Sequence, residues 1–483
     1  MSARTVIRTV SALLALVSLF MLSGVVVALA YGETELIDDF AYPAGAGILV
    51  GVLGVVALRQ RQASLSNRAG FVVVVLSWAV ASFIGAMPAY LSGAIPSYTD
   101  AFFETMSGFT TTGASILNEI ESLPRSILFW RSLTHWLGGM GIIVLTVAVL
   151  PLLGIGGLQL MKAEAPGPSV DKVTPKVTAT AKILWLIYVF LSALQTILLV
   201  FGGMDLFDAL THTFGTLATG GFSPRNASIG AYSSPYIHVV ITVFMVMAGV
   251  NFVMYHRLVT GRVGSILRDT ELRVYLGIFV AASIVVTVAL NSAGTYNTVS
   301  DSARHGAFQV ATILTTTGYA TADFAGWPAL ARGVLFLLMF VGGCAGSTGG
   351  GIKVVRIVTM VKHAFSELRT FLHPRAVFRI RINGAAVSQS VVNSVAGFVF
   401  LYVALLLTTT FVVSFDGVGL LTAFSTALVT LGNIGPGFGL VGPTENYAFY
   451  SDGVTWFLSF IMMAGRLEVY TVMVLFSRRF WLR

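Results

Sequence analysis

Four short stretches of this sequence combine glycine with threonine, asparagine or other small residues, and their backbone could bind a cation. They are TTTGAS (110–115), LATGGFS (217–223), TTTGYAT (315–321) and GNIGPGFG (432–439). Glycine reaches positive φ without a Cβ clash, so such a loop can point its carbonyl oxygens to one side. A ring of carbonyl dipoles replaces the hydration shell of an alkali cation. The alternative for any single loop is a helix–helix turn capped by Thr and Gly.

The composition indicates the surroundings in which these loops lie. Of the 483 residues, 56% are hydrophobic and only 10% are charged, and the mean hydropathy is +0.85. A water-soluble domain carries more charge, whereas about 20 successive apolar residues span a bilayer. The sequence therefore predicts a polytopic membrane protein. Its single cysteine, Cys344, has no partner for an intramolecular disulfide or for a cysteine-based metal site.

Ten apolar segments have the length of transmembrane helices. They cover 5–31, 42–59, 70–93, 127–153, 179–203, 234–256, 272–293, 328–361, 388–414 and 453–477. The first also resembles a secretory signal peptide, because Arg4 and Arg8 precede it and small residues end it at Ala30. Its apolar run exceeds the roughly 7–15 residues of a signal-peptide core. We therefore expect a retained helix, with a cleaved signal as the alternative.

Between the members of four pairs of these spans lies a segment of intermediate polarity that leads into one of the four loops. The segments cover 98–109, 205–217, 301–314 and 416–430. They are too short to cross a bilayer and predict re-entrant pore helices. Non-helical backbone at membrane depth is tolerated where protein buries it or where it lines a watery cavity. Four loops around one axis would satisfy this condition.

The predicted fold is therefore all-α, with about ten transmembrane helices, four re-entrant pore helices and a pseudo-fourfold repeat. Each repeat consists of a long helix, a pore helix, a loop and a second long helix. The predicted division is two N-terminal transmembrane helices followed by four repeats, at 1–69, 70–158, 159–262, 263–375 and 376–483.

The charges are distributed unevenly along the chain. The net charge is +8, and if the N-terminus is cytoplasmic most Lys and Arg residues fall in inner loops, as the positive-inside rule requires. This placement argues against a nucleic-acid partner. Most acidic residues, including Glu104 and Asp208, map to the outer half. We expect most of them to be solvated loop charges, which would also attract cations to an outer mouth.

The eighth span contains GGCAGSTGGGIK (342–353). Because each glycine costs about 1 kcal/mol relative to alanine in a helix, this stretch predicts a break. The alternative is close helix packing through small residues. Arg466 lies within the last span, where a charge faces protein or water. Glu468 lies on another helical face and is not its natural partner, so pairing of Arg466 with loop carbonyls is one option for it.

Several long motifs resemble the TrkH family, the membrane subunits of bacterial Trk potassium uptake systems, within a superfamily that includes the KtrB and plant HKT transporters. They are FWRSLTHWLGGMGIIVL (129–145), the four loops, GGCAGSTGGGIK and GRLEVYTVMVLF (465–476). The resemblance extends over the whole chain, including the two N-terminal helices. It implies a potassium selectivity filter at Thr110, Thr111, Thr112, Gly113, Ala218, Thr219, Gly220, Thr315, Thr316, Thr317, Gly318, Asn433, Ile434 and Gly435.

Glycine at Gly113 implies a preference for potassium, because a serine at this position accompanies sodium preference in the family. The fourth loop departs from the Thr-Gly pattern, so the filter should be asymmetric. The resemblance also implies a mobile gate below the filter, with Arg466 as a positive barrier. The gate residues are Gly342, Gly343, Gly346, Ser347, Thr348, Gly349, Gly350, Gly351, Lys353 and Arg466.

The resemblance implies potassium uptake by channel-like permeation across the bacterial inner membrane, with both termini cytoplasmic. It implies a homodimer controlled by a cytosolic nucleotide-binding subunit resembling TrkA. This chain has no Walker motif and no GxGxxG after a strand, so we expect it to bind no nucleotide. Lys353 and Arg356 either couple the gate to that subunit or anchor the helix at the membrane interface. His135 is expected to be structural.

Two other functions remain open at this stage. A sodium-permeable or ion-coupled potassium symporter would use a similar fold, although the spans hold few of the acids that proton relays require. A membrane-embedded enzyme would need paired acids, a metal cluster or a nucleophile with its base. For that function Cys344 with a distant histidine is the only candidate, so we expect no enzyme.

Overall fold

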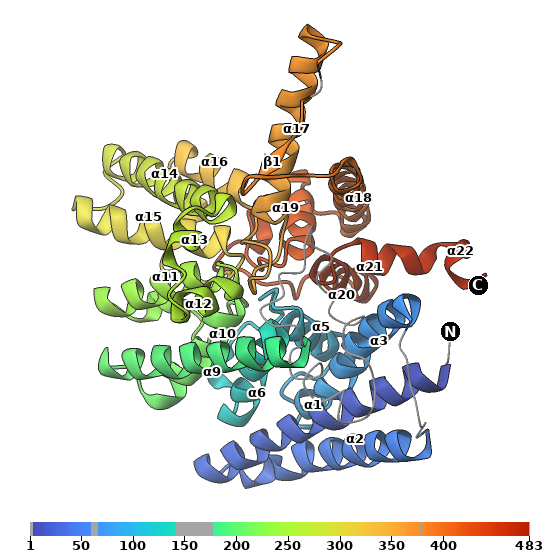
Figure 1. Ribbon diagram of the computed structural model, residues 1–483. Coiled ribbons are helices and arrows are strands. Elements are labelled where there is room, and N and C mark those ends of the chain that lie inside the picture. The colour runs from blue at the N-terminus through green and yellow to red at the C-terminus, as the bar shows by residue number, and fades with distance from the viewer. Residues whose placement is uncertain (1–2, 59–65, 142–176, 377, 483) are drawn as a thin grey trace.

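The computed structural model describes residues 3–58, 66–141, 177–376 and 378–482, and nearly all its elements are helices (Figure 1). Within these ranges the only sheet is a hairpin of β1 (Arg381–Ile382) and β2 (Ala385–Ala386), in which Arg381 pairs with Ala386. The predicted all-α polytopic fold is confirmed. The predicted boundary between residues 158 and 159 lies outside the described residues.

Two long helices form an N-terminal pair, α1 (Ala3–Tyr31) and α2 (Ile37–Ala57). They pack along one another, and α1 also packs on α3. Between them, the two carboxylate oxygens of Glu33 accept hydrogen bonds from the backbone N–H groups of Arg125 (2.6 Å) and Ser126 (2.9 Å). A carboxylate is favourable at a helix N-terminus, so Glu33 attaches the N-terminal pair to the start of α6.

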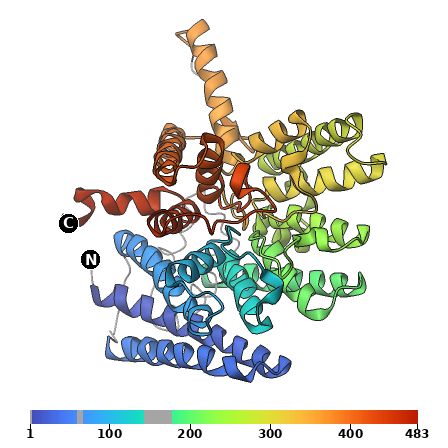
Figure 2. The ribbon, with the colours of Figure 1, turned by 180° about the vertical axis from the view of Figure 1, so that it is seen from behind.

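The other described residues form four groups of helices that surround a common centre in chain order, as the two opposite views show (Figures 1 and 2). The first group contains α3 (Asn67–Gly85), α4 (Met87–Leu91), α5 (Tyr98–Phe109) and α6 (Arg125–Trp136). The second contains α9 (Val177–Phe201), α10 (Leu206–Ala218), α11 (Pro235–Ala248), α12 (Phe252–Val259) and α13 (Val263–Leu267).

The third group contains α14 (Thr270–Ser292), α15 (Val299–Leu314), α16 (Ala329–Leu338) and α17 (Val354–Leu372). The fourth contains α18 (Gln389–Val413), α19 (Leu420–Leu431), α20 (Asp452–Arg466), α21 (Tyr470–Met473) and α22 (Arg478–Trp481). The far end of α17 projects from the bundle (Figure 1). The β-hairpin lies beside the start of α14, where the side-chain oxygen of Asn383 accepts a hydrogen bond from the Thr270 N–H at 2.7 Å.

The pore helices α5, α10, α15 and α19 lie within a few residues of their predicted positions. Three of them begin with the same local signal, a side-chain oxygen that accepts a hydrogen bond from the N–H three residues later. The acceptors are Ser97, Asp205 and Thr298, and each donor belongs to an aspartate in the first helical turn. The aspartates also complement the positive end of the helix dipole.

Six described helices are long and apolar enough to cross a membrane, and two bent pairs raise the number to eight. The bent pairs are α11 with α12, at 96°, and α20 with the segment from Tyr470 to Phe476, at 113°. The predicted span 328–361 is divided into α16 and α17 by the glycine-rich stretch. The predicted span 127–153 begins as α6 and a π-helical turn (Leu137–Gly141), and its remainder lies outside the described residues.

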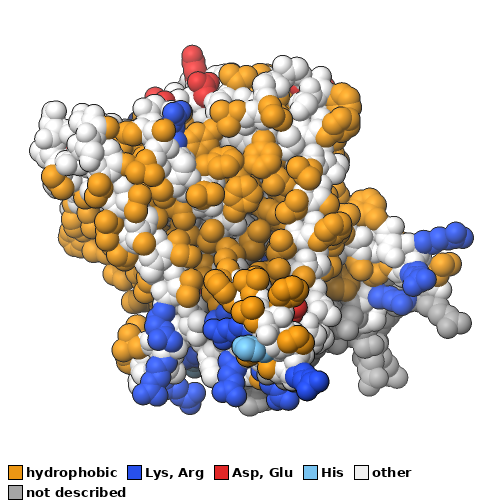
Figure 3. Space-filling view, turned by 90° about the horizontal axis from the view of Figure 1, so that it is seen from above, with side chains coloured by type: hydrophobic (Ala, Val, Ile, Leu, Met, Phe, Trp, Pro, Cys, Tyr) orange, Lys and Arg blue, Asp and Glu red, His pale blue; other side chains and the backbone are white. Residues whose placement is uncertain are grey.

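The surface of the bundle carries a broad apolar band (Figure 3). Lys and Arg side chains gather along one edge of this band, and Asp and Glu appear near the opposite edge. Arg262, Arg268 and Arg273 are exposed around the start of α14. An apolar band between polar edges is what a bilayer-spanning protein presents to lipid.

Candidate functional site

Each pore helix ends in the same backbone turn, and this turn positions the loop that follows. One residue per loop adopts a left-handed conformation, with φ of 52°, 55°, 58° and 54° at Thr111, Thr219, Thr316 and Asn433. The next N–H then bonds back to a carbonyl five residues earlier; for example, Thr112 donates to Ser107 at 2.9 Å and Thr317 to Thr312 at 2.8 Å. This is the Schellman arrangement of a helix C-terminus. It directs the loop's N–H groups to the helix.

The glycine two residues after each left-handed residue also has positive φ, between 79° and 88°, and these glycines are Gly113, Gly221, Gly318 and Gly435. Each has no room for a side chain, because a Cβ would overlap a carbonyl oxygen of the next loop. The oxygens met are those of Gly220, Thr317, Ile434 and, at 2.6 Å, Thr112. The loops therefore contact one another in the cyclic order first, second, third, fourth, first. The four carbonyls form one closed ring.

The second loop corrects one detail of the sequence prediction. By backbone conformation Gly221, with φ of 82°, corresponds to Gly113, whereas Gly220 does not have positive φ. The predicted set from Ala218 to Gly220 therefore stops one residue short of the ring. Gly220 contributes its carbonyl, and it is glycine for another reason, because a Cβ there would overlap the imidazole of His135.

All four loops open on one cavity of about 130 Å³. The four ring glycines line it together with residues that follow the loops, such as Ser115, Asn118 and Glu445. Among the described residues the loops are thus not scattered over the protein. They surround one opening, and the cavity lies at one mouth of it.

The loop side chains are held within the ring and differ between loops. In the first loop Thr110 donates to the Met106 carbonyl at 2.7 Å and lies 2.8 Å from the Thr112 hydroxyl. Thr315 and Thr317 repeat this arrangement in the third loop. In the fourth, the amide of Asn433 donates to the Thr112 hydroxyl at 2.9 Å. The ring is therefore asymmetric.

The 342–352 loop lies directly against the C-terminal ends of the third and fourth pore helices. The N–H of Gly350 donates to the hydroxyl of Thr316 at 2.7 Å. A Cβ on Gly350 would meet the Gly432 carbonyl at 2.5 Å, and one on Gly349 would lie 3.1 Å from the Thr315 carbonyl. Because glycine has no Cβ, the backbone of the 342–352 loop lies closer to the loops after α15 and α19 than it could with any other residue at these positions.

Hydrogen bonds from neighbouring helices hold both ends of this loop. On one side, the Cys344 N–H donates to the Gly249 carbonyl at 2.8 Å, at the bend between α11 and α12. On the other, one carboxylate oxygen of Glu271, in α14, accepts from the N–H groups of Ala345 (2.7 Å) and Val355 (3.0 Å). Val355 lies in the first turn of α17, so Glu271 caps that helix from outside.

Arg466 joins this loop to the first helical group. Its guanidinium donates to the Thr348 carbonyl at 2.6 Å and to the carbonyls of Gly138 and Gly139 at 2.8 and 2.9 Å. The last two belong to the π-helical turn after α6. These hydrogen bonds are the ones expected if Arg466 pairs with loop carbonyls, the first of the two sequence-based hypotheses. Arg466 also lies beside the 342–352 loop, as the second hypothesis, a positive barrier, requires; that role stays a prediction.

The contacts of Lys353 and Arg356 are internal, which argues against their role as anchors at the membrane interface. Coupling of the gate to a regulatory subunit stays a prediction. The Lys353 ammonium bonds the Gly349 carbonyl, and Arg356 is only 5% exposed. Arg356 forms an ion pair with Glu468 and lies 4.0 Å from the centre of the Phe398 ring. Glu468 lies in the bend after α20, so this pair joins α17 to the residues next to Arg466.

Two acids that the sequence placed among solvated charges are buried, and this prediction was wrong for them. Glu104 is 3% exposed and pairs with Arg131 at 2.6 Å. Asp208 is 4% exposed and pairs with Arg225 at 2.9 Å. The hydrogen bonds from Arg225 to Asp208 raise the pKa of this guanidinium above its usual value. The signal that sequence reasoning missed is position, because both acids lie inside amphipathic pore helices and not in loops.

An all-helical, multi-pass membrane protein in which four re-entrant segments meet at one opening has the architecture of a membrane cation transporter. The comparisons agree, since the family model "TrkH: Cation transport protein" matches residues 46–482. The chain belongs to the TrkH family, as the motifs indicated.

Its relatives match it along most or all of their length. The Trk system potassium uptake protein TrkH of Escherichia coli K12 is 41% identical over 427 residues, 88% of each chain. That of Halomonas elongata is 39% identical over 488 residues, covering all of both chains. The crystal structure of the potassium transporter TrkH from Vibrio parahaemolyticus superimposes with a TM-score of 0.89 at 37% identity, again over both whole chains.

Proposed function

We propose that this protein takes up potassium ions by channel-like permeation through the ring of loops after α5, α10, α15 and α19. The observation that carries the proposal is the closed cycle of contacts in which each ring glycine meets a carbonyl of the next loop. Such carbonyls replace the water around an alkali ion. The relatives named potassium uptake proteins support the choice of ion.

The proposed filter comprises Thr110 to Gly113, Ala218 to Gly221, Thr315 to Gly318 and Asn433 to Gly435. The C-terminal ends of the four pore helices precede these loops, and the negative end of a helix dipole favours a cation. The side-chain hydrogen bonds differ between the four loops, whereas backbone oxygens from every loop supply the binding. Potassium is the cargo in this proposal, and the chain itself binds no nucleotide.

The proposed gate is the 342–352 loop with Arg466. Contact of Gly350 with Thr316 and Gly432 supports a loop that blocks the inner end of the filter. The guanidinium adds a positive charge on the same path, which opposes a cation by Coulomb repulsion. Opening would require the loop to leave its bonds to Arg466 and to the bend after α11.

The proposed setting is the bacterial inner membrane, with both termini and the basic edge of the apolar band in the cytoplasm. The gradient of basic residues supports this orientation. We propose that the chain forms a homodimer of four-repeat protomers and that a cytosolic nucleotide-binding subunit resembling TrkA controls the gate. The Arg356–Glu468 pair gives movement of α17 a route to Arg466.

Purified protein in liposomes tests the proposal through rubidium flux measured against competing sodium. We expect saturable rubidium uptake that sodium inhibits weakly, and a Gly113→Ser variant that admits more sodium, because a Cβ at Gly113 displaces the Gly220 carbonyl. Flux under imposed potassium, sodium and proton gradients distinguishes a channel from a symporter. Rubidium uptake that requires a sodium or proton gradient would refute channel-like permeation and support an ion-coupled symporter.

A further inference from the structure

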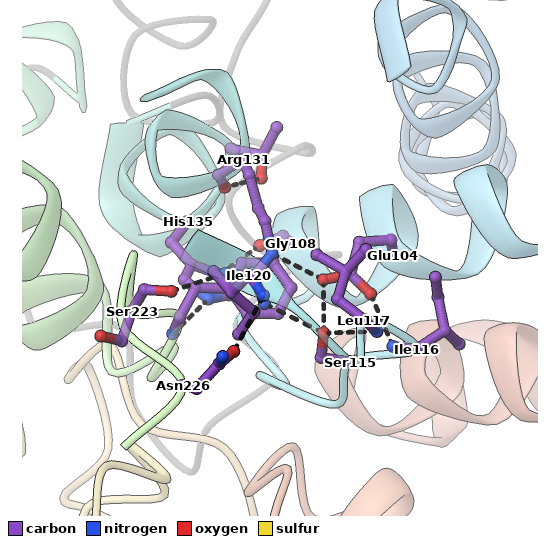
Figure 4. A network of polar contacts seen from close by, with 12 residues as sticks. Glu104, Gly108, Ser115, Ile116, Leu117, Ile120, Arg131, His135, Ser223 and Asn226 are labelled. Carbon is purple, nitrogen blue, oxygen red and sulfur yellow. Dashed lines mark hydrogen bonds and ion pairs between the residues drawn. The ribbon is translucent and has the colours of Figure 1, made fainter. Parts of the chain in front are cut away.

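The junction between the first and second loops contains a buried charged network (Figure 4). Arg131, in α6, reaches both loops and is 7% exposed. Its Nε donates to Glu104 at 2.6 Å, one terminal nitrogen donates to the Ser223 carbonyl at 3.1 Å, and the other donates to the Ser115 hydroxyl at 3.1 Å. One guanidinium therefore connects a pore helix with the outgoing segments of two loops.

Glu104 completes the attachment of the first loop. Besides Arg131, its Oε1 accepts from the Ser115 hydroxyl at 2.9 Å and its Oε2 from the Ile116 N–H at 2.9 Å. Ser115 and Ile116 follow Gly113 by two and three residues. The carboxylate thus fixes the segment that leaves the ring to the same helix, α5, that leads into the ring.

His135, one helical turn beyond Arg131, attaches the second loop. Its Nδ1 lies 2.7 Å from the Gly108 carbonyl and its Nε2 lies 3.1 Å from the Phe222 N–H. A carbonyl only accepts and an N–H only donates, so the imidazole is neutral with its proton on Nδ1. The Phe222 ring contacts both side chains. Its centre lies 3.5 Å from the Arg131 guanidinium carbon and 4.1 Å from the His135 ring centre.

Other junctions use uncharged side chains. The Tyr319 hydroxyl of the third loop donates to the His212 carbonyl at 2.9 Å, beside the second loop. The Tyr447 N–H, beside the fourth loop, donates to the Ser115 carbonyl at 2.9 Å, and its hydroxyl donates to the Gly435 carbonyl at 2.6 Å. Neither of these two junctions shows, among the described residues, an ion pair like that of Arg131 with Glu104.

We infer that Arg131 and His135 are positioning residues that set the spacing between Gly113 and the Gly220 carbonyl, and with it the preference for potassium over sodium. The inference rests on the proposed function. Discrimination by a carbonyl ring depends on its size and on the field of its dipoles. At this junction the two loops are already in contact, so relaxing their attachment changes the distance between the oxygens that face the ion.

The test is the ratio of potassium to sodium permeability in liposomes for the wild type and for Arg131→Lys. Lysine keeps the charge opposite Glu104 but cannot donate to both Ser115 and Ser223. We expect the ratio to fall about tenfold, the factor that corresponds to one lost hydrogen bond to a charged group. His135→Gln, tested in parallel, is expected to shift the ratio in the same direction. Arg304→Lys, at the Arg304–Asp301 pair in α15, is the matched control with an unchanged ratio.

The readout distinguishes positioning from general stability, because misfolding lowers flux of both ions and leaves the ratio intact. If Arg131→Lys does not assemble, the paired change Glu104→Gln with Arg131→Met removes both charges without leaving either unpaired, and it is expected to show the same loss of selectivity. Wild-type ratios in folded, conducting variants would overturn the inference. A wild-type protein without rubidium flux would instead refute the proposed function.

Discussion

Replacing Arg466 with alanine should increase ion flux, because Arg466 joins the 342–352 loop to the first helical group. The change removes the 2.6 Å bond to the Thr348 carbonyl and the two bonds to Gly138 and Gly139. Only the bond to Thr348 involves the 342–352 loop itself. A hydrogen bond to a charged group contributes about 1.5–3 kcal/mol, and each 1.4 kcal/mol is a factor of about ten.

The equilibrium between closed and open loop should therefore shift toward the open form by about ten- to a hundredfold. The other bonds of the loop, from Cys344 to Gly249 and from Gly350 to Thr316, remain. The protein should consequently stay folded and become more conductive in the absence of any regulator. Loss of the positive charge adds to the effect, since it lowers the repulsion that a passing cation meets.

The assay is rubidium uptake into liposomes that contain equal amounts of wild-type and variant protein. Arg466→Lys is the matched control. It retains the charge, but its ammonium cannot bind the Thr348 carbonyl and the π-helical turn at the same time. The flux of Arg466→Lys should therefore lie between the fluxes of the wild type and of Arg466→Ala. Unchanged or reduced uptake by Arg466→Ala, at normal expression, would refute the assignment of Arg466 as a barrier.

Three further changes test other contacts of the site. Gly221→Ala should abolish selective flux, because it places a Cβ against the Thr317 carbonyl at positive φ, which costs about 1–3 kcal/mol in strain alone; selective rubidium uptake by this variant would show that the ring tolerates displacement. Gly350→Ala should raise basal flux, since its Cβ would push the loop from the Gly432 carbonyl, and a flux below wild type would contradict a blocking loop. Glu271→Ala should also raise basal flux by releasing both ends of the loop, whereas Glu271→Gln keeps a carbonyl acceptor and should resemble wild type; equal flux in the two variants would exclude this latching role.

Much of the fold follows from patterns that are local in sequence. The pore helices were predictable because a capping residue starts three of them and a short amphipathic stretch limits their length. The break at 342–352 was predictable from its glycine density. The bend after α20 was not, since Glu468 and Val469 adopt positive φ values of 58° and 35° without being glycine. The packing around a bend of this kind, rather than its own residue type, imposes such a conformation.

The candidate site, too, was only partly predictable from the sequence. The motifs predicted which loops meet, but the adjacent glycines 220 and 221 could not be ranked from sequence, because either can adopt positive φ. The contact of Gly220 with His135 decides between them, and those residues lie far apart in the chain. Burial of Glu104 likewise depends on Arg131, in a different helix, whose guanidinium meets the cost of placing a carboxylate inside the protein.

The ring of four loops within a single polypeptide has a consequence for evolution. In an assembly of identical subunits, one nucleotide change alters every wall of the conduction pathway simultaneously. Here each wall is encoded separately, so a mutation near Asn433 leaves the codons for Thr111, Thr219 and Thr316 untouched. If the ring is the proposed filter, selection can therefore adjust ion preference one loop at a time. The different hydrogen bonds of the four loops are consistent with such stepwise divergence.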